Sequence, residues 1–585
     1  MNNQLSVTFD VTEGKLSPSS RTVRYQCADI YLRHSFCYYD QSSFLLFIGI
    51  CYNQSEILAD AETAWPQQLY RCFRDNRAAA LLRQLDGWFS GVYYNAASGE
   101  VLLFSDHLAT IPIFYCRTEN HLIVDTDLFR LADEYRRNGG SIRLCERGAH
   151  SMLAYSFMLG CDTLLEGVYK VQPAGIYSWR KDKIDTYFHY YRAEKDDSQT
   201  LESAAETIDK LFSAAIDNSF SADGNSEHLL MLSGGLDSRM CLFYALRNGY
   251  DPITTLNYSQ SFYREETIAK KIAAEHGCEH IFFSLDRGRY LSNIDEGIRA
   301  TQGMTTYRPV LQARMIWNRL QMERFGFVHS GLVGDTIIGG YCIDKCNADD
   351  RFHSAEDFAI QLNVKNKSVL SAPYCDEFRP LFNRVLDWIP TEELKKIPSE
   401  QFVLDNRYIN GLVQGSLGTR DLAVHSSAYT SKALMSYIFS IPSQWRLNHK
   451  LYFVWMNQYM PQAAHYQWEN TGLRPMYGPF AVHPHDKTTD LARWLDAVIH
   501  PKRPERSRNP YKYWMRQNAQ IEQELVEYCK RRLCVLEGYT ELMECGLQIL
   551  KHQNIYLMIR LATLVGFIWL CSNPEAEVKN RNETD

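Results

Sequence analysis

The chain has 585 residues, of which 45% are hydrophobic, 22% charged and 13% aromatic. At about 150 residues per domain this length predicts about two to four domains, and the composition excludes a disulfide-stapled miniprotein, a disordered chain, a collagen and a coiled coil. The formal net charge of −7 gives no reason to expect nucleic acid as a partner.

The 16 cysteines are scattered without a Cys-x-x-Cys pair, which favours reduced thiols. The first fifteen residues are polar and alternating rather than basic and then apolar, so we expect a cytoplasmic protein. The apolar tract 555–570 is shorter than the ~20 residues that a spanning helix needs. It also contains Arg560. We therefore expect a buried C-terminal helix and no membrane partner.

Short runs rich in β-branched and aromatic residues dominate up to about residue 190. They predict strands at 44–50, 89–94, 101–104 and 175–179. We expect an antiparallel, mostly β domain over residues 1–195. A charged segment follows, and Thr200 can cap a helix whose apolar residues recur with helical spacing. A second domain is expected over 200–572, with a polar tail at 573–585.

Strands and helices then alternate. Apolar runs predict buried strands at 228–233, 253–256, 280–285 and 326–329. The intervening patterns predict one helix up to about residue 247 and others at 265–276 and 309–324. This order predicts a doubly wound parallel sheet, in which ligands bind beyond the carboxyl ends of the strands. After about residue 390 the pattern is nearly all helical.

The strongest chemical signal is the sequence Ser-Gly-Gly-Leu-Asp-Ser at 233–238, which lies where the first of these strands ends. Two glycines allow a tight turn that points N–H groups into one concavity, and the helix N-terminus adds its positive dipole end. This predicts a pyrophosphate cradle. It lacks the lysine of a Walker loop, so we expect a divalent cation with Asp237 as a ligand. The alternative is an ordinary glycine-rich turn that Asp237 caps.

This loop resembles that of the ATP pyrophosphatases, and further motifs resemble the asparagine synthetase family. Ser330-Gly331-Leu332-Val333-Gly334-Asp335 resembles the family's second phosphate and magnesium motif, and Arg264-Glu265-Glu266 resembles its acidic helix start. Segments 440–442 and 468–472 resemble its C-terminal helical region. Segments 85–89, 106–115 and 165–173 resemble its glutaminase domain. The resemblance covers about 44–570.

The resemblance implies an α/β and α+β fold. An Ntn-hydrolase-like antiparallel β sandwich with helices would precede a doubly wound ATP pyrophosphatase domain with a helical C-terminal region. It implies that ATP and Mg²⁺ bind, with Asp237 and Asp335 as the magnesium ligands. The implied ATP-binding residues are Leu232, Ser233, Gly234, Gly235, Asp237, Ser238, Ser330 and Gly331.

The chain departs from the glutaminase pattern of this family. That glutaminase uses an N-terminal cysteine, whereas Met1 is followed here by Asn2, and Cys27 lies too close to the strand at 44–50 to replace it. Ile48 stands where the family has the asparagine that contacts glutamine. We therefore expect no glutamine hydrolysis and a domain that serves as a structural layer.

The chain also departs from the family pattern at the positions that lie near the amine acceptor in the family. Leu332-Val333 replaces the family's Glu-Gly, and Asn470 aligns with a lysine of several members. The basic run 502–508 can approach phosphate or form a solvated loop. We interpret the metal-type residues at 275–280 and 483–486 as ordinary structural contacts, because they straddle element ends or lie in a proline-bounded loop.

The leading hypothesis is an ATP-dependent, AMP-forming amide ligase without glutaminase activity. It would act on a small-molecule or peptide carboxylate and an amine. One alternative is asparagine synthesis from aspartate, and another is a nucleotide-binding scaffold without catalysis. The residues that carry the acyl transfer are not assigned, and a homodimer is left open.

Overall fold

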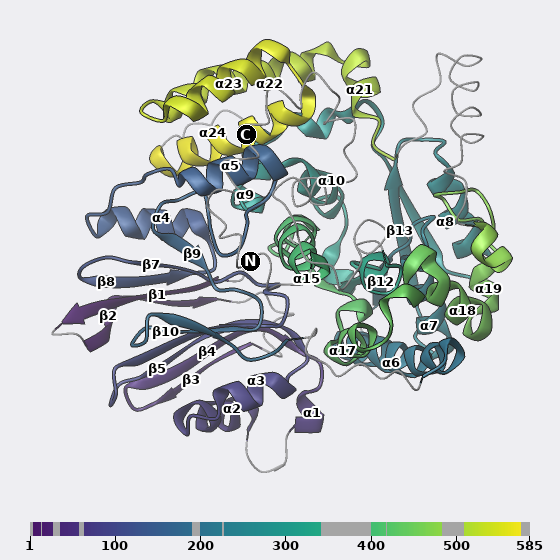
Figure 1. Ribbon diagram of the computed structural model, residues 1–585, viewed down its shortest axis with the longest axis horizontal. Helices are drawn as coiled ribbons and strands as arrows, with labels where there is room; N and C mark the ends of the chain where they lie inside the picture. Colours follow the sequence, from purple (N-terminus) through teal and green to yellow (C-terminus); the bar gives the residue numbers. More distant parts are fainter. Residues whose placement is uncertain are drawn as a thin grey trace.

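The computed structural model describes residues 4–12, 15–26, 35–57, 64–189, 199–224, 227–340, 399–416, 418–481 and 508–574. Its N-terminal part has four layers, in which two antiparallel sheets lie face to face between two pairs of helices (Figure 1). The strand order is β2-β1-β8-β7-β9 in one sheet and β11-β10-β6-β5-β4-β3 in the other. Cys27 lies outside the described residues.

The elements of these layers are short. The strands are β1 (Gln4–Thr12), β2 (Lys15–Gln26), β3 (Phe36–Asp40), β4 (Ser43–Cys51), β5 (Gly87–Asn95), β6 (Glu100–Ser105), β7 (Phe114–Arg117), β8 (His121–Asp125), β9 (Val168–Lys170), β10 (Gly175–Ser178) and β11 (Lys183–Thr186). The helices are α1 (Gln54–Ile57), α2 (Trp65–Arg74), α3 (Ala78–Gln84), α4 (Leu128–Arg137) and α5 (Glu146–Tyr155).

Alternation along the strands builds the core between the two sheets. In β1 the alternate residues Leu5, Val7 and Phe9 are completely buried there, and Ile48 of β4 joins them. Helices α2 and α3 cover the outer face of one sheet and bury Phe47 and Phe73 in a second cluster. The expected antiparallel sandwich with helices is confirmed.

A five-stranded sheet forms the centre of the second part. Its order is β14-β13-β12-β15-β16, and every neighbouring pair is parallel. The strands are β12 (Glu227–Met231), β13 (Ile253–Ser259), β14 (Glu279–Ser284), β15 (Phe325–His329) and β16 (Val424–Ser426). The strand order reverses between β12 and β15, which is where a doubly wound sheet binds its ligands.

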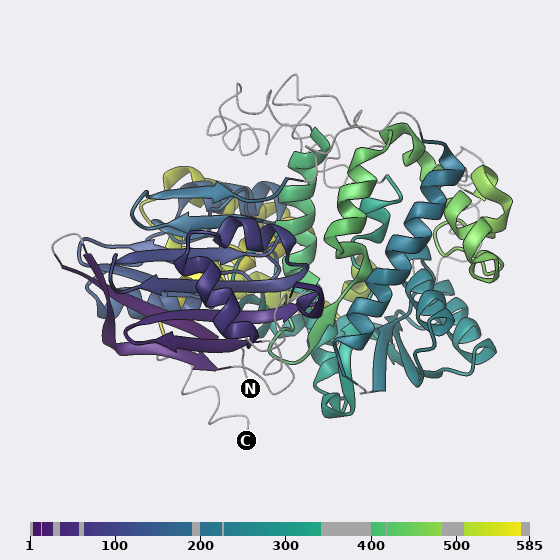
Figure 2. The ribbon, with the colours of Figure 1, turned by 90° about the horizontal axis from the view of Figure 1, so that it is seen from below.

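Helices connect these strands and cover the sheet, as Figure 2 shows from below. They are α6 (Leu201–Ser221), α7 (Leu236–Arg247), α8 (Arg264–Glu275), η3 (Asp286–Ser292), α9 (Ile294–Thr301), α10 (Arg308–Trp317), η4 (Met322–Arg324) and α11 (Gly334–Ile337). Thr200 caps α6, as expected, by accepting a hydrogen bond from the Ser203 N–H in a capping box. The predicted doubly wound sheet is confirmed.

One expectation for this region was wrong in detail, and one strand was not predicted. The helix expected at 309–324 ends at Trp317, because Ile316 and Trp317 are buried against Phe325 and Val328 and the chain turns back there. The fifth strand, β16, was not predicted, because three residues are too few to show a strand pattern.

From residue 399 on, the residues that the structure describes form helices and β16 with their connecting segments, as expected. Its elements are α15 (Ser399–Val403), η5 (Leu404–Val413), α16 (Gln414–Ser416), η6 (Ala428–Thr430), α17 (Lys432–Ser440), η7 (Ser443–Trp445), η8 (Leu447–His449), α18 (Lys450–Tyr459), α19 (Pro461–Ala464), η9 (Pro475–Ala481), α21 (Tyr511–Gln517), α22 (Ala519–Arg532), η10 (Leu533–Leu536), α23 (Thr540–His552) and α24 (Ile555–Ser572).

Helix α24 is long and apolar enough to cross a membrane by length and composition, but 83% of it is buried inside the protein. It packs against α5, α9, α22 and α23 (Figure 1). Arg560 donates to the carbonyl oxygens of Leu153 at 2.9 Å and Ala154 at 2.7 Å, which belong to the last turn of α5. The expectation of a buried C-terminal helix is confirmed, and Arg560 acts there as a cap of α5.

The segment that leads into α17 joins the two parts of the molecule. The Trp88 indole donates to the Thr430 hydroxyl at 3.0 Å, and His107 donates to the Thr430 carbonyl at 2.7 Å. The Lys432 backbone N–H donates to the Asp86 carboxylate at 3.1 Å. The Lys432 ammonium donates to the carbonyls of Leu82, Arg83 and Leu85 at the end of α3.

Candidate active site

Two loops meet at the point where the strand order reverses. The first connects β12 to α7 and contains Ser233, Gly234 and Gly235. The second connects β15 to α11 and contains Ser330 and Gly331. Because β12 and β15 are neighbouring parallel strands, the loops lie at the same edge of the sheet. The structure thus brings the two predicted phosphate motifs together.

The first loop is shaped by its own hydroxyl groups. The Ser233 N–H donates to the Ser238 hydroxyl at 2.9 Å, and the two serine hydroxyls share a hydrogen bond of 2.9 Å. The Gly235 N–H donates to the Ser233 hydroxyl at 3.1 Å. Gly235 is the N-cap of α7, so the open end of this helix, with its free N–H groups, faces the loop.

Arg239 links the first loop to residues 463–467. Nothing in the sequence pattern indicated this role. Its guanidinium is completely buried and donates to the carbonyls of Gly234 and Gly235, each at 3.0 Å. It also donates to three carbonyls that follow α18, those of Ala463, Tyr466 and Gln467. All five acceptors are neutral, and burial lowers the pKa of Arg239 to about 10.

Asp237 lies at the centre of the site. The Tyr452 hydroxyl donates to one carboxylate oxygen and the Asp335 N–H to the other, both at 2.9 Å. Burial, and then the charge of Asp335, raise the pKa of Asp237 to about 7. A Cβ atom on Gly334 would lie 2.6 Å from the Asp237 carboxyl carbon, so only glycine lets the second loop approach this closely.

Asp335 supplies the second carboxylate. His449 is hydrogen-bonded through Nε2 to the Asp335 carboxylate at 2.6 Å, and 38% of the Asp335 side chain is exposed. Two adjacent carboxylates, one buried and raised in pKa by the other, favour a bound cation. Carboxylate oxygens are the ligands that Mg²⁺ prefers, so Asp237 and Asp335 fit the expected ion.

A third group lies after β13. Glu265 is 3% exposed, and the Asn257 amide donates to Glu265 at 3.4 Å and to the Leu232 carbonyl at 2.9 Å. The Arg508 guanidinium lies 3.8 Å from the Glu265 carboxylate and 4.5 Å from the centre of the Tyr258 ring. Arg508 of the basic run 502–508 therefore reaches the site, and 502–507 lie outside the described residues.

Glu469 contacts the first loop through its backbone. Its N–H donates to the Gly234 carbonyl at 3.0 Å, and its carboxylate accepts a hydrogen bond from the Tyr263 hydroxyl. The Arg264 guanidinium donates to the Glu469 carbonyl at 3.1 Å. Because the backbone bond from Glu469 to Gly234 fixes this segment against the glycine-rich loop, the next residue, Asn470, also belongs to the edge of the site.

The second loop carries two apolar side chains, Leu332 and Val333. Leu332 is partly buried against the main core, and its carbonyl accepts a hydrogen bond of 2.9 Å from the Ser427 hydroxyl. Val333 is 7% exposed and has a φ of 64°, in the left-handed region that a β-branched residue rarely adopts. The pair that replaces Glu-Gly therefore lies in the turn between Ser330 and Asp335.

Other metal-type residues of the sequence do not converge. His276 is hydrogen-bonded to the Tyr466 hydroxyl at 3.1 Å, whereas His280 is hydrogen-bonded to the Thr255 hydroxyl at 2.8 Å. This agrees with the interpretation of 275–280 as structural contacts. Residues 483–486 lie outside the described residues. Tyr452 and His449 were missed, because only the tertiary fold brings them to the two aspartates.

Comparison with known proteins matched a family model and distant solved structures. Residues 207–463 match the family model of asparagine synthase. A glutamine phosphoribosylpyrophosphate amidotransferase from B. subtilis, complexed with ADP and GMP, is 12% identical, with 48% of this chain and 85% of that chain covered and a TM-score of 0.22. An allosteric regulatory enzyme of purine biosynthesis is 10% identical, with 48% and 75% covered and a TM-score of 0.21. Only the family match supports an argument about this chain.

Proposed function

We propose that this chain activates a carboxylate with ATP and transfers the acyl group to an amine, because residues 207–463 form an asparagine synthase domain, which is typical of ATP-utilising, amide-forming ligases. The products would be an amide, AMP and pyrophosphate. The observation that carries this proposal is the meeting of Asp237 and Asp335 beside the N-terminus of α7. A site for a nucleoside triphosphate needs ligands for a divalent cation and donors for the phosphate oxygens.

Different residues of the site bind the phosphates, bind Mg²⁺ and orient the magnesium ligands. The Gly234 N–H, the Ser233 and Ser238 hydroxyls and the first turn of α7 bind phosphate oxygens, as do Ser330 and Gly331 of the second loop. Asp237 and Asp335 hold Mg²⁺, which neutralises the phosphate charge when it is bound. Tyr452 and His449 orient the two carboxylates through hydrogen bonds of 2.9 and 2.6 Å. Leu232, with its side chain 1% exposed, precedes the first loop and completes the nucleotide-binding set.

The first experiment follows the nucleotide product. The purified chain is incubated with ATP, Mg²⁺ and a panel of carboxylates and amines, and AMP, ADP and pyrophosphate are measured. AMP with pyrophosphate supports the proposal. Mg²⁺-dependent ATP binding without turnover on any substrate supports a non-catalytic scaffold instead. Asp237→Ala is the binding control: unchanged calorimetric affinity for Mg²⁺-ATP in a folded Asp237→Ala protein contradicts the assignment of the site.

The acceptor is proposed to be an amine with an organic body rather than ammonia. Leu332 and Val333 replace a carboxylate and a glycine beside the phosphate loop, and they offer an ammonium ion no partner for its lost hydration. A matching apolar group gains about 1.5–3 kcal/mol from burial against such a leucine. Asparagine formation from aspartate and ammonium by the unmodified protein contradicts this. Activity that appears only in the Leu332→Glu, Val333→Gly double variant supports it.

The N-terminal sandwich is proposed to have no glutaminase activity. Ile48 is completely buried in the core between the sheets and has no amide to bind glutamine. The Asp86 carboxylate, two residues before Trp88, accepts a hydrogen bond from the Lys432 backbone N–H. Incubation with glutamine, with and without ATP, should release no glutamate above background. Glutamate release that Cys27→Ala abolishes would show that another residue arrangement restores the activity.

A further inference from the structure

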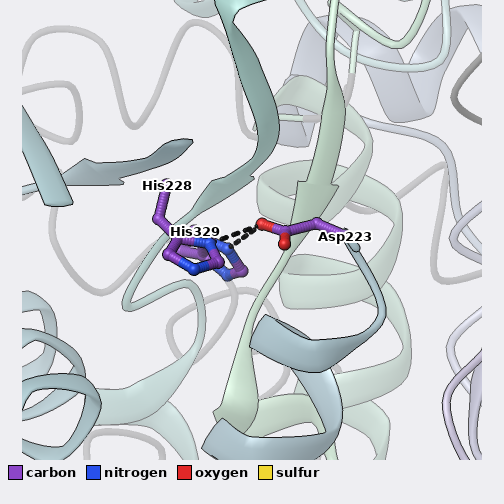
Figure 3. Close-up of side chains that lie close together, drawn as sticks. All are labelled: Asp223, His228 and His329. Atoms are coloured by element: carbon purple, nitrogen blue, oxygen red, sulfur yellow. Dashed lines mark hydrogen bonds and ion pairs between the residues drawn. The ribbon is translucent and has the colours of Figure 1, made fainter. Parts of the chain in front are cut away.

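Three buried side chains form a cluster outside the proposed nucleotide site. Asp223 follows α6, His228 lies on β12, and His329 is the last residue of β15. One potential ligand atom from each lies within 4.8 Å of the others. Figure 3 shows both imidazole rings turned toward the same Asp223 carboxylate.

The topology places these residues on one face of the sheet. Leu230 of β12 is in register with His329 of β15, and His228 lies two residues before Leu230. Since side chains alternate along a strand, His228 and His329 point to the same face. The rings are fixed by packing, because the Phe220 ring stacks on His329 with centroids 3.6 Å apart and lies 4.9 Å from His228.

The hydrogen bonds of Asp223 are unevenly shared between its two oxygens. Oδ2 accepts from His228 Nδ1 at 2.7 Å, from His329 Nε2 at 3.1 Å and from the Phe327 N–H at 3.4 Å. Oδ1 is buried and has no hydrogen-bond partner among the residues that the structure describes. A buried carboxylate oxygen without a donor is costly, and an ion is one of its ordinary explanations.

We propose that Asp223, His228 and His329 bind a structural zinc ion. Two imidazole nitrogens and a carboxylate are suitable ligands for Zn²⁺, and the second oxygen of Asp223 brings the set to four donor atoms. Ligand atoms from different residues of a tetrahedral zinc lie about 3.3 Å apart, so shifts of up to about 1.5 Å bring these side chains, now within 4.8 Å of one another, to that spacing. When the ion binds, each neutral imidazole takes the tautomer that carries its proton on the other ring nitrogen, His228 Nε2 and His329 Nδ1, so that the ligating nitrogen offers its lone pair to the ion.

The surroundings of the cluster support this use. The other nitrogen of His329, Nδ1, is hydrogen-bonded to the Ser426 hydroxyl at 2.7 Å, and such a partner commonly orients a metal-binding histidine. A Cβ atom on Gly326 would lie 2.8 Å from the Asp223 Cβ, so a glycine makes room for the carboxylate. Burial of all three side chains, at 2–6% exposure, favours a structural role over a catalytic one.

A zinc ion here would join α6, β12 and β15, and thereby the two strands whose loops form the nucleotide site. His329 directly precedes Ser330, so the ion would fix the start of the second loop without contacting the nucleotide. The inference does not depend on the proposed ligase activity, and its test measures metal content rather than turnover.

The test uses the full chain, stripped with a chelator and then equilibrated with Zn²⁺ alone. One zinc per chain is expected by elemental analysis. Asp223→Asn and His329→Gln should lose it, and Ser426→Ala should weaken zinc affinity by about 10- to 100-fold. His425→Gln, a buried histidine that is hydrogen-bonded to Thr419 outside the cluster, and Asp335→Asn should both retain it.

X-ray absorption of the zinc-loaded unmodified protein keeps the proposal falsifiable if a variant does not fold. The chain has 16 cysteines, so a thiolate site is the main competitor. Nitrogen and oxygen neighbours with imidazole scattering support the cluster. Sulfur neighbours, no stoichiometric zinc, or equal zinc in folded Asp223→Asn and unmodified proteins would each overturn it.

Discussion

Substitutions at Val333 test whether the backbone of the second loop is strained, because the backbone and the side chain of Val333 make opposing contributions to stability. The side chain is 7% exposed and belongs to the main hydrophobic cluster, whereas its φ of 64° is unfavourable for any residue with a Cβ. Strain of this kind is common beside functional sites. Val333→Ala and Val333→Gly both remove the buried methyl groups, so the difference between these variants isolates the backbone.

The expected difference follows from three contributions. At an ordinary buried site glycine is less stable than alanine by about 1–2 kcal/mol, because it buries one carbon fewer and its unfolded chain has more entropy. In the left-handed region a Cβ costs about 1–2 kcal/mol, and glycine escapes that cost. We therefore expect Val333→Ala and Val333→Gly to have free energies of unfolding within about 1 kcal/mol of each other.

Urea denaturation of both variants measures this difference. Val310 is the matched control, because it is completely buried in α10 and its φ is not positive. Val310→Gly should be less stable than Val310→Ala by about 1–2 kcal/mol. If glycine is as unfavourable relative to alanine at position 333 as at position 310, the left-handed turn is not a source of strain and the reasoning is refuted.

Four further predictions follow from buried contacts. Arg239→Lys should lower the free energy of unfolding by about 2–4 kcal/mol, measured with urea, because three ammonium donors cannot satisfy five carbonyls. Gly334→Ala should leave the circular dichroism unchanged and weaken Mg²⁺-ATP binding about tenfold or more in calorimetry, because its methyl group displaces the Asp237 carboxylate, which we propose binds magnesium. Burial raises the pKa of Glu265, so ionisation of Glu265 destabilises the folded state as pH rises; Arg508→Ala should therefore lose more stability at pH 8 than at pH 5 in thermal melts. Lys432→Met should lower the free energy of unfolding by about 3–5 kcal/mol and increase proteolysis between the two parts, and an unchanged cleavage rate would contradict the role of this lysine.

Local patterns in the sequence were sufficient for much of the fold. The strand at 228–233 and the glycine-rich turn after it could be predicted, because burial on both faces and a helix start leave signals within a few residues. The pairing of Asp237 with Asp335 followed from topology alone, since parallel strands bring their carboxyl ends to one edge.

Contacts set by tertiary structure could not be predicted in this way. Tyr452 and His449 lie on or beside α18 and reach the aspartates only after the helical region has packed on the sheet. Arg508 is one residue of a basic run, and only the packing of its backbone against the segment after β13 shows which cation approaches Glu265. The cluster of Asp223 with two histidines likewise depends on the pairing of β12 with β15.

Two buried cations link the N-terminal sandwich to the rest of the described chain. Lys432 and Arg560 are 7% and 3% exposed, and each donates to carbonyl oxygens at the C-terminal end of a helix in the sandwich, α3 and α5 respectively. These carbonyls have no partner within their own helices, and a cation at a helix C-terminus also interacts favourably with the dipole. Removing the sandwich would leave both cations without their acceptors and expose the apolar face of α24. The sandwich therefore contributes to the stability of the part of the chain that carries Lys432 and Arg560, whatever chemistry the sandwich itself has.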